Sequence, residues 1–208
     1  MKFSPYLIVK NFEDEIATFT GSKFAISVDS CTNAIFLISK YLKVEEVTIP
    51  SKTYLSIPQS VIHAGGTVVF DKREETNNWK GLYQLKPYPI FDSAKRLRKN
   101  MYIKGSYMSL SFHIKKSLGI SKGGMILTDD EFANDWFRKA RYEGRSEKNY
   151  KEDDIDFLGW NMYMTPQQAA HGLALLQNYD EQTPDQEEPN GYRDLTEFTV
   201  FKNFKIIQ

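Results

Sequence analysis

The sequence predicts an α/β fold in which a mostly parallel central sheet is flanked by helices. Short runs rich in apolar and β-branched residues alternate with segments of helical periodicity, which is the pattern of a parallel sheet covered on both faces. The chain has 208 residues, enough for one main domain with a sizeable core. Its 27 Lys+Arg balance 27 Asp+Glu, so the zero net charge favours neither nucleic acid nor an anionic membrane as a partner.

The first half of the chain alternates helix and strand. A helix is expected where Phe12, Ile16 and Phe19 fall on one stripe. The run FAISV then predicts a strand, and TNAIFLISKYL predicts a buried helix that begins near Thr32. A strand, a helix that stops at a Gly pair and another strand follow. In order, these elements span residues 11–21, 24–28, 32–42, 46–50, 53–66 and 67–71.

The second half adds three strands and two helices before its character changes. The three strands are expected at YPIFD (88–92), YMSLSF (107–112) and GMILTD (124–129). The two helices are expected over residues 130–144 and 165–178. From Tyr179 onward the segment DEQTPDQEEPNG is acidic and rich in turn residues, and LTEFTVFKNFKII is consistent with one or two strands. We therefore expect an α/β domain over residues 1–179, followed by an acidic linker and a short C-terminal β segment over residues 180–208.

The sequence also indicates the cellular compartment and argues against a metal site. Cys31 is the one cysteine, so no internal disulfide can form, and no window approaches the roughly 18 apolar residues of a membrane span. The first 15 residues have too short an apolar run for a signal peptide. We expect a cytoplasmic protein, and no metal site, because His63, His113 and His171 lack ligand partners at useful spacing.

Three segments carry candidate chemistry. Asp29–Asn33 joins a strand end to a helix start, where backbone N–H groups and the Thr32 hydroxyl suit a phosphate, although a plain helix cap explains the same residues. Asp92 ends an apolar strand, a position that faces the ligand crevice in open α/β sheets or caps the next turn. In SFHIKK, Lys116 is either a partly desolvated amine nucleophile or one of two solvated lysines.

Taken in order along the chain, these segments resemble the DegT/StrS family of pyridoxal-phosphate (PLP) sugar aminotransferases. The most specific part of the resemblance is the cofactor-attachment segment, which is matched by Ser111, Phe112, His113, Lys116, Gly123 and Gly124. SCTNAI resembles the family's phosphate-binding turn, FDSAK the segment with the ring-nitrogen aspartate, and GWNMYMTPQQAAHGLALL a stretch that reaches the neighbouring subunit. The resemblance runs from about Asn11 to Tyr179 and implies the large domain of fold type I PLP enzymes over residues 1–179.

The resemblance implies a role for each matching residue. Lys116, rather than Lys115, would hold PLP as a Schiff base, and Asp92 would pair with its ring nitrogen. The remaining cofactor contacts that the resemblance implies are Tyr54 on the ring face, Thr32, Asn33 and Ser111 at the phosphate, Lys95 near the phenolic oxygen, and Asn161 reaching the phosphate of the partner in a homodimer with shared sites.

The implied reaction moves an amino group from an amino-acid donor, such as glutamate, to a keto-sugar on a nucleotide carrier. Two departures support an alternative, a non-catalytic relative kept as a PLP-binding or dimerisation module. Lys95 stands where the family usually has Gln or His, and most of the family's small C-terminal domain has no counterpart after Tyr179. A sugar dehydratase of this family is disfavoured, because those enzymes have histidine in place of the Schiff-base lysine.

Overall fold

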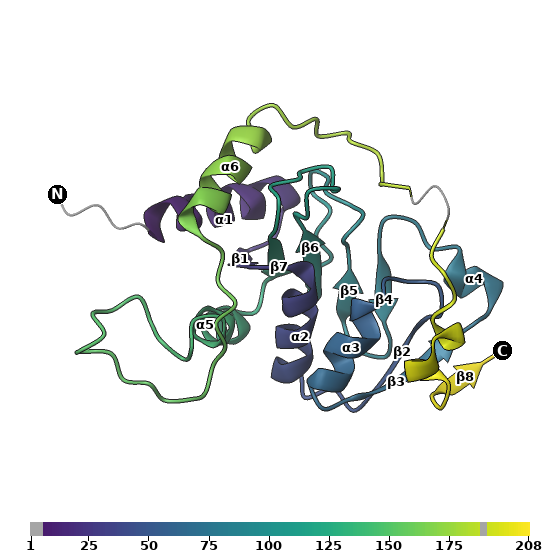
Figure 1. The fold of residues 1–208 in the computed structure, drawn as a ribbon. Helices are drawn as coiled ribbons and strands as arrows, with labels where there is room; N and C mark the ends of the chain where they lie inside the picture. Colours follow the sequence, from purple (N-terminus) through teal and green to yellow (C-terminus); the bar gives the residue numbers. More distant parts are fainter. Residues whose placement is uncertain (1–5, 188–190) are drawn as a thin grey trace.

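The computed structural model describes residues 6–187 and 191–208 of the protein (Figure 1). Its helices are α1 Tyr6–Thr20, α2 Cys31–Tyr41, α3 Ser56–His63, α4 Glu74–Asn77, α5 Glu131–Ala140 and α6 Pro166–Leu176. Its strands are β1 Phe24–Val28, β2 Glu46–Pro50, β3 Thr67–Asp71, β4 Tyr83–Leu85, β5 Ile90–Asp92, β6 Tyr107–Ser111, β7 Gly124–Thr128 and β8 Lys205–Ile207. Two 3-10 turns, η1 Leu195–Glu197 and η2 Thr199–Phe201, precede β8.

The strands form two sheets that are joined by one bridge. The larger sheet has the order β1-β7-β6-β5-β4, and the smaller has the order β2-β3-β8. Thr48 and Lys86 exchange backbone hydrogen bonds of 2.7 and 3.0 Å, which link β2 to the end of β4 in antiparallel fashion. Within the described residues, β4 and β7 therefore run opposite to all the other strands. The predicted α/β class is confirmed, and most strands share one direction, but in the larger sheet only β5 and β6 pair in parallel and the other pairings are antiparallel.

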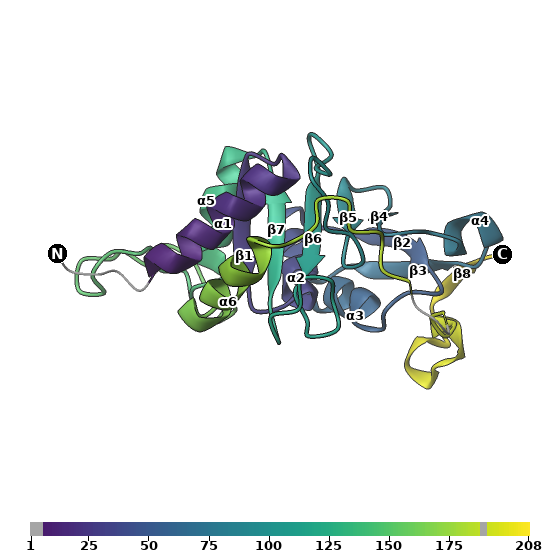
Figure 2. The same ribbon diagram turned by 90° about the horizontal axis from the view of Figure 1, so that it is seen from above.

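Helices cover both faces of the sheet, and the core lies in two layers (Figures 1 and 2). Along β7, Met125 and Leu127 pack into the cluster that contains side chains of α1 and α6. Ile126, which points the other way, packs into the cluster that contains side chains of α2, α3 and α5. This alternation is the period of two that a strand imposes. It explains why the central strands β6 and β7 are buried on both faces and mostly apolar.

The N-terminal helix follows the predicted stripe but is longer than expected. Phe12 and Ile16 are fully buried and Phe19 is partly buried, as the periodicity predicted. The helix begins at Tyr6, one and a half turns before the predicted start. Its partner α6 approaches closely at Gly172, where an added Cβ would lie 2.5 Å from the Phe12 ring. The absence of a side chain at Gly172 therefore sets the spacing of this helix pair.

Several boundaries were not predicted. The helix α4 and the strand β4 were missed, because runs of four and three residues are too short to show a period. Of the one or two strands expected in the C-terminal segment, the structure has one, β8, which the turns η1 and η2 precede. Strand β8 pairs in parallel with β3, and Lys72 N–H donates to Ile207 O at 2.8 Å. The C-terminal segment thus extends the smaller sheet.

Residues 180–187, which the sequence predicted as part of an acidic linker, pack against the loop that follows β5. We call them the C-terminal strap. The Arg96 guanidinium donates to both carboxylate oxygens of Asp185, at 2.8 and 2.6 Å. The backbone N–H of Gln186 donates to Lys95 O at 2.9 Å. None of the helices in the described residues combines the length and apolar character needed to cross a membrane.

Candidate active site

The strands that share one direction end at one edge of the sheet, and a cavity of about 880 Å³ lies there. It is lined by Thr32 at the start of α2, Asp92 at the end of β5 and Ser111 at the end of β6. Tyr54, before α3, and Lys116, in the loop between β6 and β7, complete the predicted residues around it. The structure therefore brings five of the eight predicted site residues to one cavity.

The turn between β1 and α2 forms the end of the cavity that was expected to hold a phosphate. Ser30 caps the helix, since its Oγ accepts the N–H of Asn33 at 3.1 Å. Strand β7 begins directly against this turn: an added Cβ on Gly124 would lie 2.4 Å from the Ser30 carbonyl carbon and 2.5 Å from Cys31 N. The second glycine of the Gly-Gly pair therefore lets β7 and the helix start come together.

Thr32 and Asn33 have different environments, although they are neighbours. Thr32 Oγ1 lies 2.9 Å from Ser56 Oγ, and both residues line the cavity. Asn33 Nδ2 instead donates to Asp29 Oδ1 at 2.7 Å, and Asp29 also pairs with Lys122 at 3.1 Å. The amide of Asn33 is thus held by a carboxylate, and Asn33 is not among the residues that line the cavity.

Asp92 is the buried acid of the site, with 3% of its surface exposed. Its carboxylate accepts the N–H of Ala94 at 3.0 Å, so it also caps the following turn. Burial raises the pKa of Asp92, whereas the Ala94 N–H, the Tyr83 hydroxyl and the charge of Lys116 act in the opposite direction. Tyr83 is itself held by Thr53, whose hydroxyl is 2.7 Å away. A cation placed beside a buried carboxylate stabilises the charged form that burial disfavours.

Lys116 and Lys115 differ in burial. The loop that carries them is anchored by Phe112 and Ile120, each 1% exposed, and by the hydrogen bond from Ile120 N–H to Phe112 O at 3.0 Å. Within this loop Lys116 N–H donates to His113 O at 2.7 Å. Lys116 is half-buried beside Asp92, whereas Lys115 is exposed. The interpretation that both are solvated is therefore correct only for Lys115.

Lys95 is buried in a neighbouring hollow of about 650 Å³ rather than in the main cavity. Its Nζ lies 5.0 Å from the ring centre of Trp79 and 4.6 Å from that of Tyr192, within cation–π distance. The two hollows share Trp79, Tyr192 and, from the strap, Gln186 and Glu187. Lys95 is therefore next to the site and does not line it.

Asn161 does not line the cavity of its own chain. It is exposed, and its Nδ2 donates to Glu143 Oε1 at 3.0 Å. Its backbone forms an isolated antiparallel bridge with Tyr142. Asn161 is therefore not among the residues of this chain that line the cavity.

Some residues of the site were missed in the sequence. Cys31 lines the cavity, and burial together with the nearby Asp92 raises the pKa of its thiol, which stays neutral. Tyr83 supports Asp92 from the unpredicted strand β4. Gln186 comes from the strap, and only a long-range contact brings it to the cavity. No local motif marks Tyr83 or Gln186.

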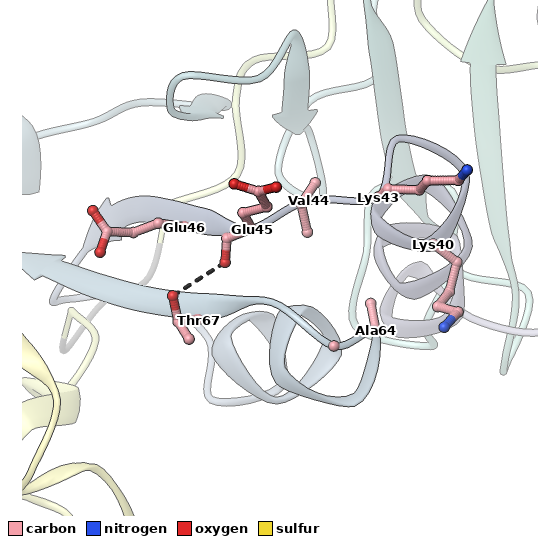
Figure 3. Close-up of a pocket in the computed structure, with 8 residues that line it drawn as sticks. Lys40, Lys43, Val44, Glu45, Glu46, Ala64 and Thr67 are labelled. Carbon is pink, nitrogen blue, oxygen red and sulfur yellow. Dashed lines mark hydrogen bonds between the residues drawn. The ribbon is translucent and has the colours of Figure 1, made fainter.

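A further hollow, of about 510 Å³, lies at the opposite ends of β2 and β3 (Figure 3). Lys40, Lys43, Glu45 and Glu46 line it, and the hydroxyl of Thr67 donates to Glu45 O at 3.1 Å. None of the predicted site residues lies there. This hollow combines charges of both signs and has no acid or base that is buried.

Comparison with known proteins agrees with the motifs. The sequence matches the DegT/DnrJ/EryC1/StrS aminotransferase family over residues 2–80 and 99–194. It is 28% identical to the spore coat polysaccharide biosynthesis protein SpsC of Bacillus subtilis, over 88% of this chain and 60% of that protein. It is 27% identical to the GDP-perosamine synthase of Caulobacter vibrioides, over 83% of this chain and 57% of that protein. The chain thus spans 57–60% of the length of these two relatives.

Solved structures show the same fold. A putative PLP-dependent aminotransferase from Bacillus cereus superposes with a TM-score of 0.77 at 15% identity, over 98% of this chain and 83% of that one. Helicobacter pylori PseC, an aminotransferase involved in the biosynthesis of pseudoaminic acid, has a TM-score of 0.68 at 17% identity, over 86% and 58% of the two chains. Because the family match covers most of the sequence, the chain belongs to the DegT/DnrJ/EryC1/StrS aminotransferase family, as the motifs predicted.

Proposed function

We propose that this protein is a PLP-dependent aminotransferase that moves an amino group from an amino-acid donor, such as glutamate, to a keto-sugar carried on a nucleotide. One observation carries the proposal: a half-buried lysine, a buried carboxylate and two hydroxyl residues, Lys116, Asp92, Thr32 and Ser111, meet at a single cavity. The names of relatives that make or transfer amino-sugars support the substrate class.

The residues of the cavity fit the functional groups of PLP. The phosphate suits the Thr32 and Ser111 hydroxyls and the N-terminus of α2. The ring nitrogen suits Asp92, because a carboxylate whose pKa is raised by burial gains most from a cation beside it. The aldehyde suits the primary amine of Lys116. An exposed ring, Tyr54, is available to pack on the cofactor face.

The chemistry would then be divided among these side chains. When bound, PLP supplies an electron sink for charge that develops on the substrate Cα. Asp92 would hold the proton on the ring nitrogen, and its burial would exclude water from that pair. Lys116 would hold the cofactor until an incoming amine replaces it, after which its free Nζ would take the proton from the substrate Cα. Thr32 and Ser111 would fix the phosphate and so the orientation of the ring.

We also propose a homodimer with shared sites. Asn161 is exposed and lies outside its own cavity, which is compatible with a role toward the cavity of a second subunit. A non-catalytic PLP-binding or dimerisation module is the second candidate. One observation favours it: the ammonium group of Lys95, which was expected near the phenolic oxygen of PLP, lies on the rings of Trp79 and Tyr192.

The test uses purified protein with added PLP and a matched pair of variants. Borohydride reduction followed by peptide mass mapping should place the adduct on Lys116, and Lys116→Ala should lose it while Lys115→Ala, on the exposed neighbour, should keep it. In a separate sample that has not been reduced, glutamate should discharge the visible absorbance of the bound cofactor. Adduct formation without discharge by any amino donor would favour the non-catalytic candidate. An adduct on Lys115, or none with PLP in excess, would overturn the assignment.

A further inference from the structure

Strand β4 brings a buried tyrosine hydroxyl to the acid of the site. Because β4 runs antiparallel to β5, its first residue, Tyr83, lies opposite the last residue of β5, Asp92. Side chains that face each other across an antiparallel pair lie on the same side of the sheet, with Cβ atoms about 5 Å apart. Tyr83 is 7% exposed and Asp92 is 3% exposed. Their side chains form a hydrogen bond that is shielded from water.

The ring and the hydroxyl of Tyr83 are both held in place. The ring packs on Trp79, with ring centres 4.7 Å apart, and Trp79 is itself fixed by the hydrogen bond from its Nε1–H to Lys52 O at 3.1 Å. The hydroxyl lies 2.7 Å from the Oγ1 of Thr53, a residue that is 2% exposed. Thr53 directly precedes Tyr54 in the loop after β2. The Tyr83 hydroxyl therefore joins this loop to the acid on β5.

The direction of the two hydrogen bonds follows from the charge of Asp92. An ionised carboxylate can only accept hydrogen bonds, and a tyrosine hydroxyl has a single hydrogen to donate. When Asp92 is ionised, the hydrogen of Tyr83 therefore goes to Asp92, and Thr53 donates to the hydroxyl oxygen of Tyr83. The three side chains form an ordered chain of hydrogen bonds that ends on the negative charge.

The Asp92 carboxylate keeps acceptor positions for a ligand. Its Oδ1 accepts the N–H of Ala94 at 3.0 Å, and Tyr83 is the second donor. A carboxylate has about four acceptor positions, so about two remain, and Asp92 lines the main cavity. Both donors favour the charged form of Asp92, which burial disfavours. A carboxylate that is charged, oriented and open to the cavity suits a protonated ring nitrogen.

We propose that Tyr83 is a positioning residue, which orients the Asp92 carboxylate toward the ring nitrogen of PLP with Thr53 as its own support. Tyr83 is not among the residues that line the main cavity, so it acts through Asp92. The inference rests on the proposed function for the presence of PLP. A residue that only shapes the cavity would affect all ligands of that cavity alike. Tyr83 should instead affect a ligand that has a nitrogen opposite Asp92.

The experiment measures the Kd of two ligands by equilibrium dialysis of the purified protein. The ligands are PLP and its carbocyclic analogue, in which a C–H group replaces the ring nitrogen. Tyr83→Phe should raise the Kd of PLP about tenfold, because a hydrogen bond to a charged group is lost, and should change that of the analogue less than about twofold. Thr53→Val should raise the Kd of PLP by a smaller factor. Thr53→Ser restores a hydroxyl and should return the Kd toward the wild-type value.

The matched control is Tyr107→Phe. Tyr107 is also a buried strand residue, 8% exposed, and its hydroxyl donates to Asp130 at 2.7 Å. Neither of these two residues lines the main cavity. The control variant loses the same kind of hydrogen bond and should leave the Kd of both ligands unchanged. If circular dichroism shows that Tyr83→Phe does not fold, Thr53→Val, which keeps the tyrosine, decides between the outcomes.

Three results would overturn the proposal. They are an unchanged Kd of PLP in Tyr83→Phe, an equal loss of affinity for PLP and for the analogue, or an equal loss in Tyr107→Phe. The second would show that Tyr83 only shapes the cavity. Binding of PLP by the wild type without a selective effect of Tyr83→Phe would refute this inference and leave the proposed function standing. No binding of PLP by the wild type would refute both.

Discussion

Replacing Glu13 by Gln should cost the protein about 3 kcal/mol of stability. Glu13 lies on α1 with 1% of its surface exposed. Its carboxylate accepts the N–H and the hydroxyl of Ser27, at 2.8 and 2.7 Å, and binds Arg138 at 2.7 Å and Arg141. These bonds tie together helix α1, strand β1 and the end of helix α5. Glutamine keeps the shape of the side chain and removes its charge.

The magnitude follows from the pKa of Glu13. Burial alone would raise it, but the charges of Arg141 and Arg138 lower it to about 2. Compared with the value of about 4.3 in an unfolded chain, this corresponds to about 3 kcal/mol in favour of the folded state. The removal of one partner from a buried ion pair typically costs about 3–5 kcal/mol, which is the same range. Because the folded-state pKa is the lower one, the contribution is complete above pH of about 4.3 and disappears as the pH falls toward about 2.

The assay is urea unfolding of wild type, Glu13→Gln and Glu15→Gln. Glu15 is an exposed residue of the same helix and serves as the control, with an expected change of less than about 0.5 kcal/mol. The difference in the free energy of unfolding between wild type and Glu13→Gln should become smaller as the pH is lowered from neutral to about 3. A loss below about 1 kcal/mol at neutral pH, or a gap that does not change with pH, would refute the reasoning. Since Ser27 lies in the strand that leads to Thr32, the variant should also bind PLP more weakly.

Three further predictions concern the site. Asp92→Asn should still bind PLP but slow half-transamination by glutamate about 100-fold or more, because an amide cannot hold the ring nitrogen protonated; unchanged rates in stopped-flow absorbance would make Asp92 only a structural cap. Gly124→Ala should cost about 1–3 kcal/mol in urea unfolding, because its Cβ would lie 2.4 Å from the Ser30 carbonyl carbon; a neutral result would mean that the turn moves freely. Mixing equal amounts of Lys116→Ala and Asn161→Ala chains should restore about a quarter of wild-type sites, since half of the dimers are mixed and each has one intact site of two. No recovery despite subunit exchange would contradict shared sites.

The strands and the centre of the site were predictable because they depend on local pattern. The runs at 24–28, 46–50 and 67–71 became strands at those bounds, since short runs of mostly apolar or β-branched residues between turns have few alternatives. Asp92 and Ser111 follow from topology: residues at the carboxyl ends of strands that share a direction must meet at one edge. The loop with Lys116 adds the third component, because its apolar residues dock it beside that edge.

Side chains with a choice of partner were not predictable. Asn33 was expected at a phosphate, but the nearby carboxylate of Asp29 binds its amide. Lys95 was expected near the cofactor, but Trp79 and Tyr192 hold its ammonium group. In both cases the competing group is strong, and for Tyr192 it is distant in sequence. A sequence motif identifies the residue at a position, but it does not determine which neighbouring group that side chain contacts in the fold.

The C-terminal strap shows that a composition signal can be real and still be misinterpreted. Its composition predicted an acidic, turn-rich linker, yet two of its acidic residues pair with the basic run at 95–99. Glu181 pairs with Lys99 at 2.7 Å and Asp185 with Arg96 at 2.6 Å. The first pair is exposed and contributes little to stability. The second pair is bidentate and more buried, so it holds the strap in its position. An added Cβ on Gly81 would lie 2.4 Å from the Asp185 carboxyl carbon, so the glycine leaves the space that this pair requires. The two complementary charge runs therefore deliver Gln186 to the cavity, and they could have been paired from the sequence had the acidic segment been treated as a docking partner.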